Sequence, residues 1–317
     1  MNKIIIVAGP TAVGKTGSAI KLAQALNTDI VSADSMQIYK YMNIGTAKPT
    51  LQEMARVKHH MINVADPLQN DYSVALYKKQ AEEVIQKLHC KGKIPVIAGG
   101  TGLYLNSIMY NMDFSNSTYD PEYRNMLQHL SNEKGNSYLH NKLKSVDPDS
   151  AEIIHPNNVK RVIRALEVYH RTGFPIKKFS SALRLNTKYE ILFFRLHRER
   201  NLLYDRINLR VDEMIENGLI EEVVKLTQMG LTEKHTAMKG IGYKEVLEHL
   251  SGITDINEMK YKIKLNSRHY AKRQITWLRR YKEAIQIELE DSEDLNTNKL
   301  LGITKTFIIN NNNKRGK

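Results

Sequence analysis

The sequence contains a single cysteine and lacks any long hydrophobic run. Cys90 is the only cysteine in 317 residues, which excludes an internal disulfide framework and a cysteine-based zinc site. No apolar stretch approaches the roughly 20 residues that a transmembrane helix needs. The apolar run at residues 4–8 is too short for the core of a signal peptide. We therefore expect a cytoplasmic globular protein in a reducing environment.

Acidic side chains are scarce as well. The chain has 47 Lys or Arg against 34 Asp or Glu, a net charge of +13. Residues 260–282 hold nine Lys or Arg, no Asp or Glu, and the aromatic residues Tyr261, Tyr270 and Trp277. A solvated helix usually mixes both signs of charge, whereas a one-sign helix with aromatic residues suits a phosphodiester backbone. The charge predicts a nucleic-acid partner, with an anionic membrane or an ordinary basic surface as alternatives.

The clearest motif is a glycine-rich stretch near the N-terminus. GPTAVGKT at residues 9–16 matches the phosphate-binding loop pattern G-x-x-x-x-G-K-[ST], between an apolar β-branched run and a helical pattern. Backbone N–H groups of such a loop, with the N-terminus of the following helix, surround phosphate oxygens. Lys15 would reach a terminal phosphate, and the Thr16 hydroxyl would ligate Mg²⁺. Alone, the loop predicts a nucleotide such as ATP, its commonest ligand.

Further apolar segments at residues 29–33, 94–98 and 189–196 are predicted to be strands of the same sheet. Asp34 directly follows the first segment, and Thr101 follows the second within GGTGLY. Because ligands bind beyond the carboxyl ends of parallel strands, we expect both side chains to face the loop's crevice. Asp34 is interpreted as a catalytic carboxylate in preference to a helix N-cap.

Two other features of the chain leave more than one interpretation. The adjacent His59 and His60 could be metal ligands, but no third ligand is evident, so a structural or substrate-contact role is favoured. The polar segment from about residue 114 opens a stretch without strand alternation, which predicts helices. A long last helix is expected from residue 257 to about 288.

The predicted architecture is α/β: a P-loop NTPase-like parallel sheet core flanked by helices, with a helical insert domain. Residues 1–113 and 186–309 are assigned to the core with its C-terminal basic helices. Residues 114–185 are assigned to the insert, and residues 310–317 to a disordered tail.

Nine sequence strings resemble the bacterial tRNA dimethylallyltransferase (isopentenyl-adenosine tRNA transferase) family, in family order between about residues 3 and 280. The strings are GPTAVGKT at 9–16, DSMQIY at 34–39, IGTAKP at 44–49, YSVA at 72–75, GGTGLY at 99–104, RVIRALEV at 161–168, RINLRVDEM at 206–214, GIGYKE at 240–245 and AKRQITWLR at 271–279. The family usually has Asp where this chain has Asn63, and Thr where it has Ser267.

The resemblance implies transfer of a five-carbon allylic group from dimethylallyl diphosphate to N6 of the adenosine on the 3′ side of the anticodon, position 37 of tRNA. That amine is a poor nucleophile because its lone pair is delocalised into the ring. A carboxylate that takes its proton therefore makes its attack on the donor easier. Asp34 matches the family's base. The departing diphosphate gathers negative charge, which loop amides, Lys15, Mg²⁺ on Thr16 and Arg210 would stabilise. The adenine must be flipped out of its stack to reach such a crevice.

The resemblance also implies a set of site residues. Catalytic roles fall to Asp34, Thr101 and Arg210. The diphosphate is assigned to Gly9, Pro10, Thr11, Ala12, Val13, Gly14, Lys15 and Thr16, with Thr16 also the metal ligand. Contacts with the tRNA anticodon stem-loop are assigned to Asp34, Ser35, Met36, Gln37, Thr101, Arg124, Lys160, Arg161, Val162, Ile163, Arg164, Lys239, Gly240, Ile241, Gly242, Tyr243, Lys244, Lys272, Arg273, Gln274, Ile275, Thr276, Trp277, Leu278 and Arg279. We expect a monomer that does not bind membranes.

Three other functions use some of the same features. A small-molecule or nucleoside kinase would share the loop, with Asp34 as base for a hydroxyl, but would give the basic aromatic helix no task. A prenyltransferase acting on free adenine nucleotides would share the loop too, and the basic helix and insert argue against it. A non-catalytic RNA-binding NTPase would need neither Asp34 nor Thr101 in the crevice.

Overall fold

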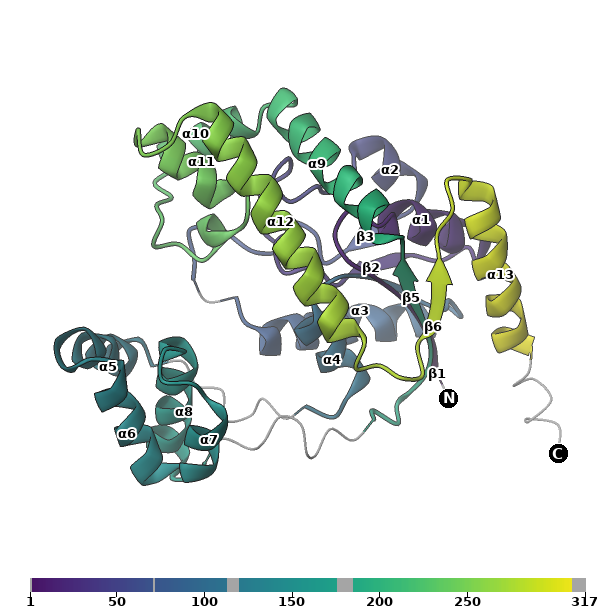
Figure 1. The fold of residues 1–317 in the computed structure, drawn as a ribbon. Helices are drawn as coiled ribbons and strands as arrows, with labels where there is room; N and C mark the ends of the chain where they lie inside the picture. The colour runs from purple at the N-terminus through teal and green to yellow at the C-terminus, as the bar shows by residue number, and fades with distance from the viewer. Residues whose placement is uncertain (1, 71, 113–119, 176–184, 310–317) are drawn as a thin grey trace. The chain divides into compact units, whose positions relative to one another are not determined.

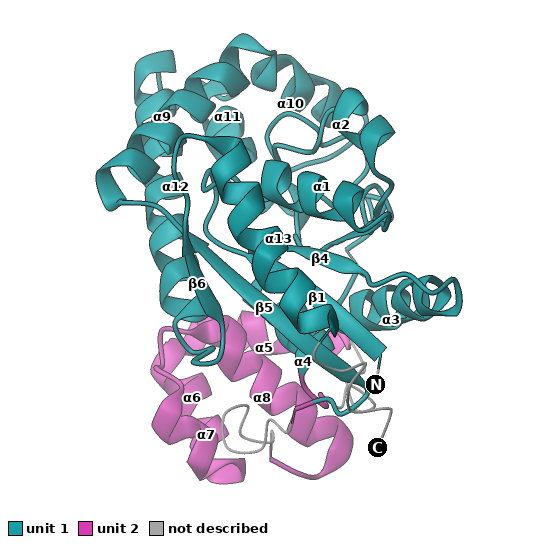
Figure 2. Ribbon diagram, turned by 90° about the vertical axis from the view of Figure 1, so that its right-hand side faces the viewer, with its two compact units in different colours: residues 1–109, 186–317 teal, residues 110–185 magenta. Residues whose placement is uncertain are grey.

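The structure is a computed structural model that describes residues 2–70, 72–112, 120–175 and 185–309. The chain divides into two compact units, residues 1–109 with 186–317 and residues 110–185, which Figure 2 colours separately. The tail predicted at residues 310–317 lies outside the described residues. Among the helices of the described part, none is both long and apolar enough to cross a membrane.

The first unit is built on a parallel sheet of six strands (Figure 1). In sheet order these are β3 (His59–His60), β2 (Ile30–Ser32), β4 (Val96–Gly99), β1 (Asn2–Ala8), β5 (Tyr189–His197) and β6 (Ile285–Glu288). β1 lies between two neighbours, with Ile6 opposite Ile97 and Phe193. Residues 4–8 are completely buried, as expected for a strand that is covered on both faces. The predicted parallel α/β architecture is therefore confirmed.

Besides the sheet, the first unit contains helices, some of which pack on the strands. They are α1 (Lys15–Ala25), α2 (Leu51–Arg56), α3 (Val74–Cys90), α4 (Gly102–Met109), α9 (Arg200–Glu216), α10 (Leu219–Gln228), α11 (Tyr243–Leu250), α12 (Ile256–Leu278) and α13 (Glu293–Ile309), with a 3₁₀ turn η1 (Ala237–Lys239). The core formed by β1, β4 and β5 includes Ile5, Val96 and Phe194, and α1 and α13 add Leu22 and Leu300.

The expected long last helix is wrong in its C-terminal part. The helix α12 ends at Leu278, and β6 then pairs with β5 through Phe194 opposite Ile285. The buried Ile287 and Leu289 alternate with exposed residues, which is a strand pattern of period two. The edge strand β3 has two residues, too few to establish an alternation, whereas the alternating residues of β6 lie within the range predicted for the long helix.

The second unit is a small helical domain with its own core. Its helices are α5 (Pro121–Lys134), α6 (Asn136–Val146), α7 (Pro148–Ile153) and α8 (Val159–Thr172). Asp120 and Asp147 cap α5 and α7, each followed by proline at the first helical position, which suits a helix start. The buried side chains Leu127, Leu143 and Leu166 form the centre of this unit.

Candidate active site

The phosphate-binding loop connects β1 to α1 at the carboxyl end of the sheet. Gly14 caps α1 in the left-handed conformation, with φ of 111°, and Ala12 also has a positive φ of 61°. No side chain caps α1. Because the first N–H groups of a helix have no partner within it, this end of α1 presents free donors and the positive end of the helix dipole. The loop therefore has the form of an anion site.

One predicted loop donor is already in use. The N–H of Thr11 donates to Gln274 Oε1 at 2.8 Å, so it does not point toward a bound anion. The Nε2 group of Gln274 donates to the carbonyl oxygen of Gly100 at 3.1 Å. Gln274 thus joins the phosphate-binding loop to the turn that carries Thr101. Its side chain is buried, so the tRNA contact predicted for it would have to act through these two partners.

A cavity opens beside the loop, with about 380 Å³ of empty space when the adjoining open solvent is included. Its lining brings residues from α1, β2, β3 and β4 together. They are Lys15, Thr16, Ala19, Ile30, Ser32, Asp34, Gln37, Pro49, His59, Ala98 and Gly99. Lys15 and Thr16 thus share one cavity with Asp34, as the strand order leads one to expect, because β1, β2 and β4 are adjacent.

Asp34 and Thr101 are held by one compact turn. The Oδ1 atom of Asp34 accepts hydrogen bonds from the N–H groups of Met36 at 2.9 Å and Gln37 at 3.3 Å. The Oγ1 atom of Thr101 accepts from the N–H of Ser35 at 3.0 Å. A Cβ on Gly99 would lie 2.2 Å from the carbonyl oxygen of Ala33, so only glycine allows β4 to pass this close to the Asp34 turn.

Positive charge beside the loop is poorly compensated by the protein. The pKa of Lys15 is lowered to about 8, mainly by burial; Asp34 opposes this shift and the positive charge of Arg210 adds to it. Burial, followed by the charge of Arg206, also lowers the pKa of Arg210. These three cations and the uncapped helix end favour an anionic ligand at the loop.

The segment after Asp34 is fixed by a buried carboxylate from α10. Glu222 accepts hydrogen bonds from the N–H groups of Asn43 at 2.7 Å, Ile44 at 2.8 Å and Gly45 at 3.1 Å. It also accepts from the hydroxyl of Tyr243 at 2.7 Å, and burial followed by Glu222 raises the pKa of that hydroxyl. Tyr243, predicted to contact tRNA, is completely buried and lies at the centre of this bracing.

Lys48 and the histidine pair have local roles in the same region. The Lys48 ammonium donates three hydrogen bonds, one for each of its hydrogens. The acceptors are the backbone carbonyl of Tyr39 at 2.5 Å and the side-chain oxygens of Asn43 at 3.1 Å and Asn63 at 2.7 Å. His60 bonds to Asp29 at 2.9 Å, whereas His59 lines the cavity. In the described part of the chain, no group of three His, Cys, Asp or Glu side chains could hold a metal.

The basic helix α12 presents two different faces. Lys272, Arg273 and Arg279 are exposed, whereas Leu278 and Gln274 are buried. The face of Trp277 packs on the Thr101 turn, since a Cβ on Gly102 would lie 2.1 Å from the indole. Exposed cations therefore lie on a helix that contacts the Asp34–Thr101 turn. The exposed Lys239 and Lys244 flank the buried Tyr243.

The predicted tRNA contacts of the insert belong to the second unit. Lys160 and Arg161 are exposed, whereas Val162 and Ile163 are buried in the core of that unit. Arg124 and Arg164 both bind the fully buried Glu167, Arg124 through two bonds of 2.8 and 2.7 Å. Burial alone would raise the pKa of Glu167, but hydrogen bonds from Arg124, the Asp120 N–H and Arg164 lower it below its usual value.

The fold and site together define a class. A phosphate-binding loop on a parallel sheet, with a carboxylate in the same cavity and a basic helix beside it, describes a P-loop-type enzyme that acts on a phosphorylated substrate. The family model described as IPP transferase matches residues 37–281. The chain belongs to this family, which confirms the resemblance seen in the sequence.

Curated relatives and solved structures agree with this membership. The chain is 50% identical over 280 residues to the tRNA dimethylallyltransferase of Alkaliphilus oremlandii, covering 88% of this chain and 89% of that protein. A full-length tRNA isopentenylpyrophosphate transferase from Bacillus halodurans superposes with a TM-score of 0.70 at 40% identity, covering 95% of this chain and 96% of that one. A eukaryotic dimethylallyltransferase acting on tRNA superposes with a TM-score of 0.84 at 30% identity, covering 98% of this chain and 80% of that one.

The sequence did not reveal Glu222, Arg206 or Arg198 as site residues. Glu222 lies beside the similar Glu221 in α10, and only tertiary contacts, with Tyr243 and with the N–H groups of residues 43–45, distinguish the two. Arg206 lies one helical turn before Arg210, so its i, i+4 spacing could have identified it. Arg206 Nε donates a hydrogen bond to the carbonyl oxygen of Ala12 in the loop at 3.0 Å.

Proposed function

We propose that the protein transfers a dimethylallyl group from dimethylallyl diphosphate to N6 of the adenosine at position 37 of tRNA. The observation that carries this is the shared cavity, in which Lys15 and Thr16 lie with Asp34. The relatives named tRNA dimethylallyltransferase and the eukaryotic enzyme acting on tRNA support the reaction. The position on tRNA and the identity of the donor are taken from the reaction that the family resemblance implies.

Asp34 is the general base in this proposal. The N6 amine attacks the first carbon of the donor, and the bond from that carbon to the diphosphate oxygen breaks, so its electron pair leaves with the diphosphate. The proton of N6 passes to the carboxylate of Asp34. Because Oδ1 is engaged by two backbone N–H groups, the other oxygen is the acceptor. Thr101, bonded to Ser35 in the same turn, lies beside the reacting amine.

The phosphate-binding loop receives the leaving group. Lys15, the N–H groups at the start of α1 and Arg210 stabilise the negative charge that develops as the carbon–oxygen bond breaks. Thr16, Ser32 and Asp34 line the cavity, and their side chains carry hard oxygen ligands of the kind that suits Mg²⁺. The ion would be held by Thr16 and diphosphate oxygens, and it would supply further charge neutralisation.

The exposed basic residues receive the tRNA. Lys272, Arg273 and Arg279 of α12, with Lys239 and Lys244, would contact phosphates around the flipped adenine. In the insert, Arg124, Lys160 and Arg164 would contact the same anticodon stem-loop. We further propose that the protein acts as a cytoplasmic monomer.

The test uses purified protein with Mg²⁺ and three labelled reactions run in parallel. Label from dimethylallyl diphosphate should enter unmodified tRNA that has adenosine at position 37, and should enter AMP much less. Label in AMP alone would assign the protein to nucleotide prenylation instead. Transfer of label from the γ-phosphate of ATP, with none from the prenyl donor, would show a kinase and would refute the proposal.

A further inference from the structure

The segment formed by β6 and α13 lies entirely beyond the residues that match the family model, which end at 281. It nevertheless packs against the phosphate-binding loop. Leu289, one residue after β6, bonds through its N–H to the carbonyl of His197 at 2.9 Å. Its Cδ1 lies 3.3 Å from the position of a Cβ on Gly14. The first turn of α13 pairs with α1, where Lys21 binds Glu293 at 3.1 Å and Asp294 at 3.0 Å.

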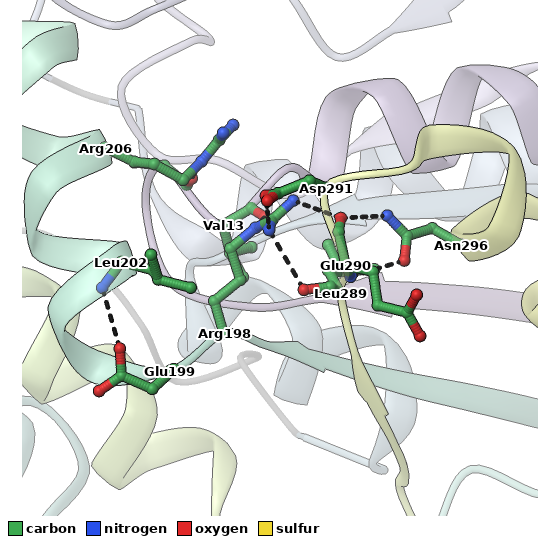
Figure 3. A network of polar contacts seen from close by, with 10 residues as sticks. Val13, Arg198, Glu199, Leu202, Arg206, Leu289, Glu290, Asp291 and Asn296 are labelled. Carbon is green, nitrogen blue, oxygen red and sulfur yellow. Dashed lines mark hydrogen bonds and ion pairs between the residues drawn. The ribbon is translucent and has the colours of Figure 1, made fainter.

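Arg198, which follows β5, connects this segment to the loop (Figure 3). Its side chain is only 7% exposed. Its Nε donates to the carbonyl of Val13 at 3.1 Å, Nη1 to the carbonyl of Leu289 at 3.1 Å, and Nη2 to the carbonyl of Glu290 at 3.0 Å. Nη1 also lies 3.4 Å from the exposed carboxylate of Asp291. The planar guanidinium fork therefore joins one loop carbonyl to two carbonyls of the C-terminal segment.

Asn296 in α13 fixes the far side of this contact. Its Oδ1 accepts from the N–H of Glu290 at 2.9 Å, and its Nδ2 donates to the carbonyl of the same residue at 2.8 Å (Figure 3). Both polar atoms of the Asn296 side-chain amide therefore bond to the backbone of Glu290. The backbone that Arg198 holds is therefore anchored independently of Arg198.

The carbonyl contacts determine where the loop N–H groups point. In a trans peptide, the carbonyl of one residue and the N–H of the next point in opposite directions. Arg198 holds the carbonyl of Val13 and therefore fixes the direction of the N–H of Gly14. Arg206 holds the carbonyl of Ala12 and in the same way fixes the direction of the N–H of Val13. Ala12 has a positive φ, a conformation that needs such support.

We propose that Arg198 is a positioning residue for the diphosphate donor, and that residues 289–296 form part of the donor site by holding its guanidinium. The inference rests on the proposed function, because the loop is taken to bind the diphosphate. Arg198 does not contact the donor in this proposal. It acts through the orientation of the Val13–Gly14 peptide.

The test compares Arg198→Lys with Arg195→Lys in the full-length protein. Arg195 is a matched control, because it also joins β5 to β6, donating to Gln286 at 2.6 Å and to the carbonyl of Leu278 at 3.3 Å, without touching the loop. Calorimetry gives the affinity for dimethylallyl diphosphate, and filter binding gives the affinity for tRNA. Loss of a charged hydrogen bond to the loop predicts donor affinity lower by about tenfold in Arg198→Lys. The affinity for tRNA and all values for Arg195→Lys should stay at the wild-type level.

Asn296→Ala provides a second variant far from the loop. Asn296→Ala should lower the affinity for the donor by a smaller factor than Arg198→Lys does, and it should leave the affinity for tRNA unchanged. Unchanged donor affinity in both variants, or an equal loss in Arg195→Lys, would overturn the inference. Loss of donor and tRNA affinity in parallel would also overturn it, since that result indicates general unfolding. Failure of the proposed function is distinguishable, because the wild-type protein would then transfer no prenyl group.

Discussion

Donor binding should weaken as the pH rises above 8, because Lys15 must be protonated to hold the diphosphate. Burial lowers the pKa of Lys15 to about 8, from an ordinary value of 10.5. A bound diphosphate favours the charged ammonium and returns this pKa toward its ordinary value. The complex therefore retains a proton that the free protein loses between about pH 7 and 9.

The size of the effect follows from this pKa. If only the protonated form binds, the fraction of competent protein is about 0.9 at pH 7 and about 0.1 at pH 9, so the apparent Kd rises about tenfold. That corresponds to roughly 1.4 kcal/mol of binding free energy. The diphosphate of the donor becomes more negative as the pH rises, which by itself would tighten binding. Ionisation of the donor therefore changes the apparent Kd in the direction opposite to deprotonation of Lys15.

The assay is calorimetric titration of dimethylallyl diphosphate between pH 7 and 9.5 at constant ionic strength. Lys15→Arg keeps its charge throughout and should show a flat profile. Lys48 is the necessary control, because burial also lowers its pKa to about 8 while Glu222 opposes the shift. Lys48→Met should keep the wild-type pH slope. A wild-type Kd that is constant or falls over this range, or a slope that persists in Lys15→Arg, would refute the reasoning.

Three further outcomes are expected. Asp34→Asn, which keeps an oxygen for the two backbone N–H groups, should lower turnover by about 10² to 10⁴ and leave tRNA affinity unchanged in filter binding; a parallel loss of affinity would make Asp34 a binding residue. Glu222→Ala should lower the free energy of unfolding by about 3 kcal/mol in urea denaturation, since it leaves buried donors unpaired, whereas the exposed neighbour Glu221→Ala should change it little; equal values for both would contradict the bracing role. Lys272→Ala should weaken tRNA binding and reduce its salt slope by about 1, unlike Lys87→Ala on α3, and an unchanged slope would remove α12 from the interface.

The sequence was sufficient for the central part of the fold. The phosphate-binding loop and the strands that became β1, β2, β4 and β5 were identifiable, because buried parallel strands are continuous apolar runs bounded by turn residues. Their order in a parallel sheet then places Asp34 and Thr101 at the same edge as the loop. Composition and periodicity alone were enough for this, without any contact information.

Contacts between distant segments were beyond the same reasoning. Gln274 was assigned a tRNA contact with its neighbours in residues 272–279 by the family resemblance, yet its amide is buried between Thr11 and Gly100. Glu222 accepts four hydrogen bonds from segments 21 and about 180 residues away in the chain. β3 has two residues, which is too few for a period to be recognised. Such features depend on tertiary packing, which a local sequence pattern does not encode.

The most direct measurement is mass analysis of nucleosides from the anticodon fragment of tRNA treated with the protein, Mg²⁺ and dimethylallyl diphosphate. We expect a prenyl group on N6 of the adenosine at position 37, formed far more slowly when the Asp34→Asn variant replaces the wild-type protein. A fragment of unchanged mass, or a prenyl group on another nucleoside, would contradict it.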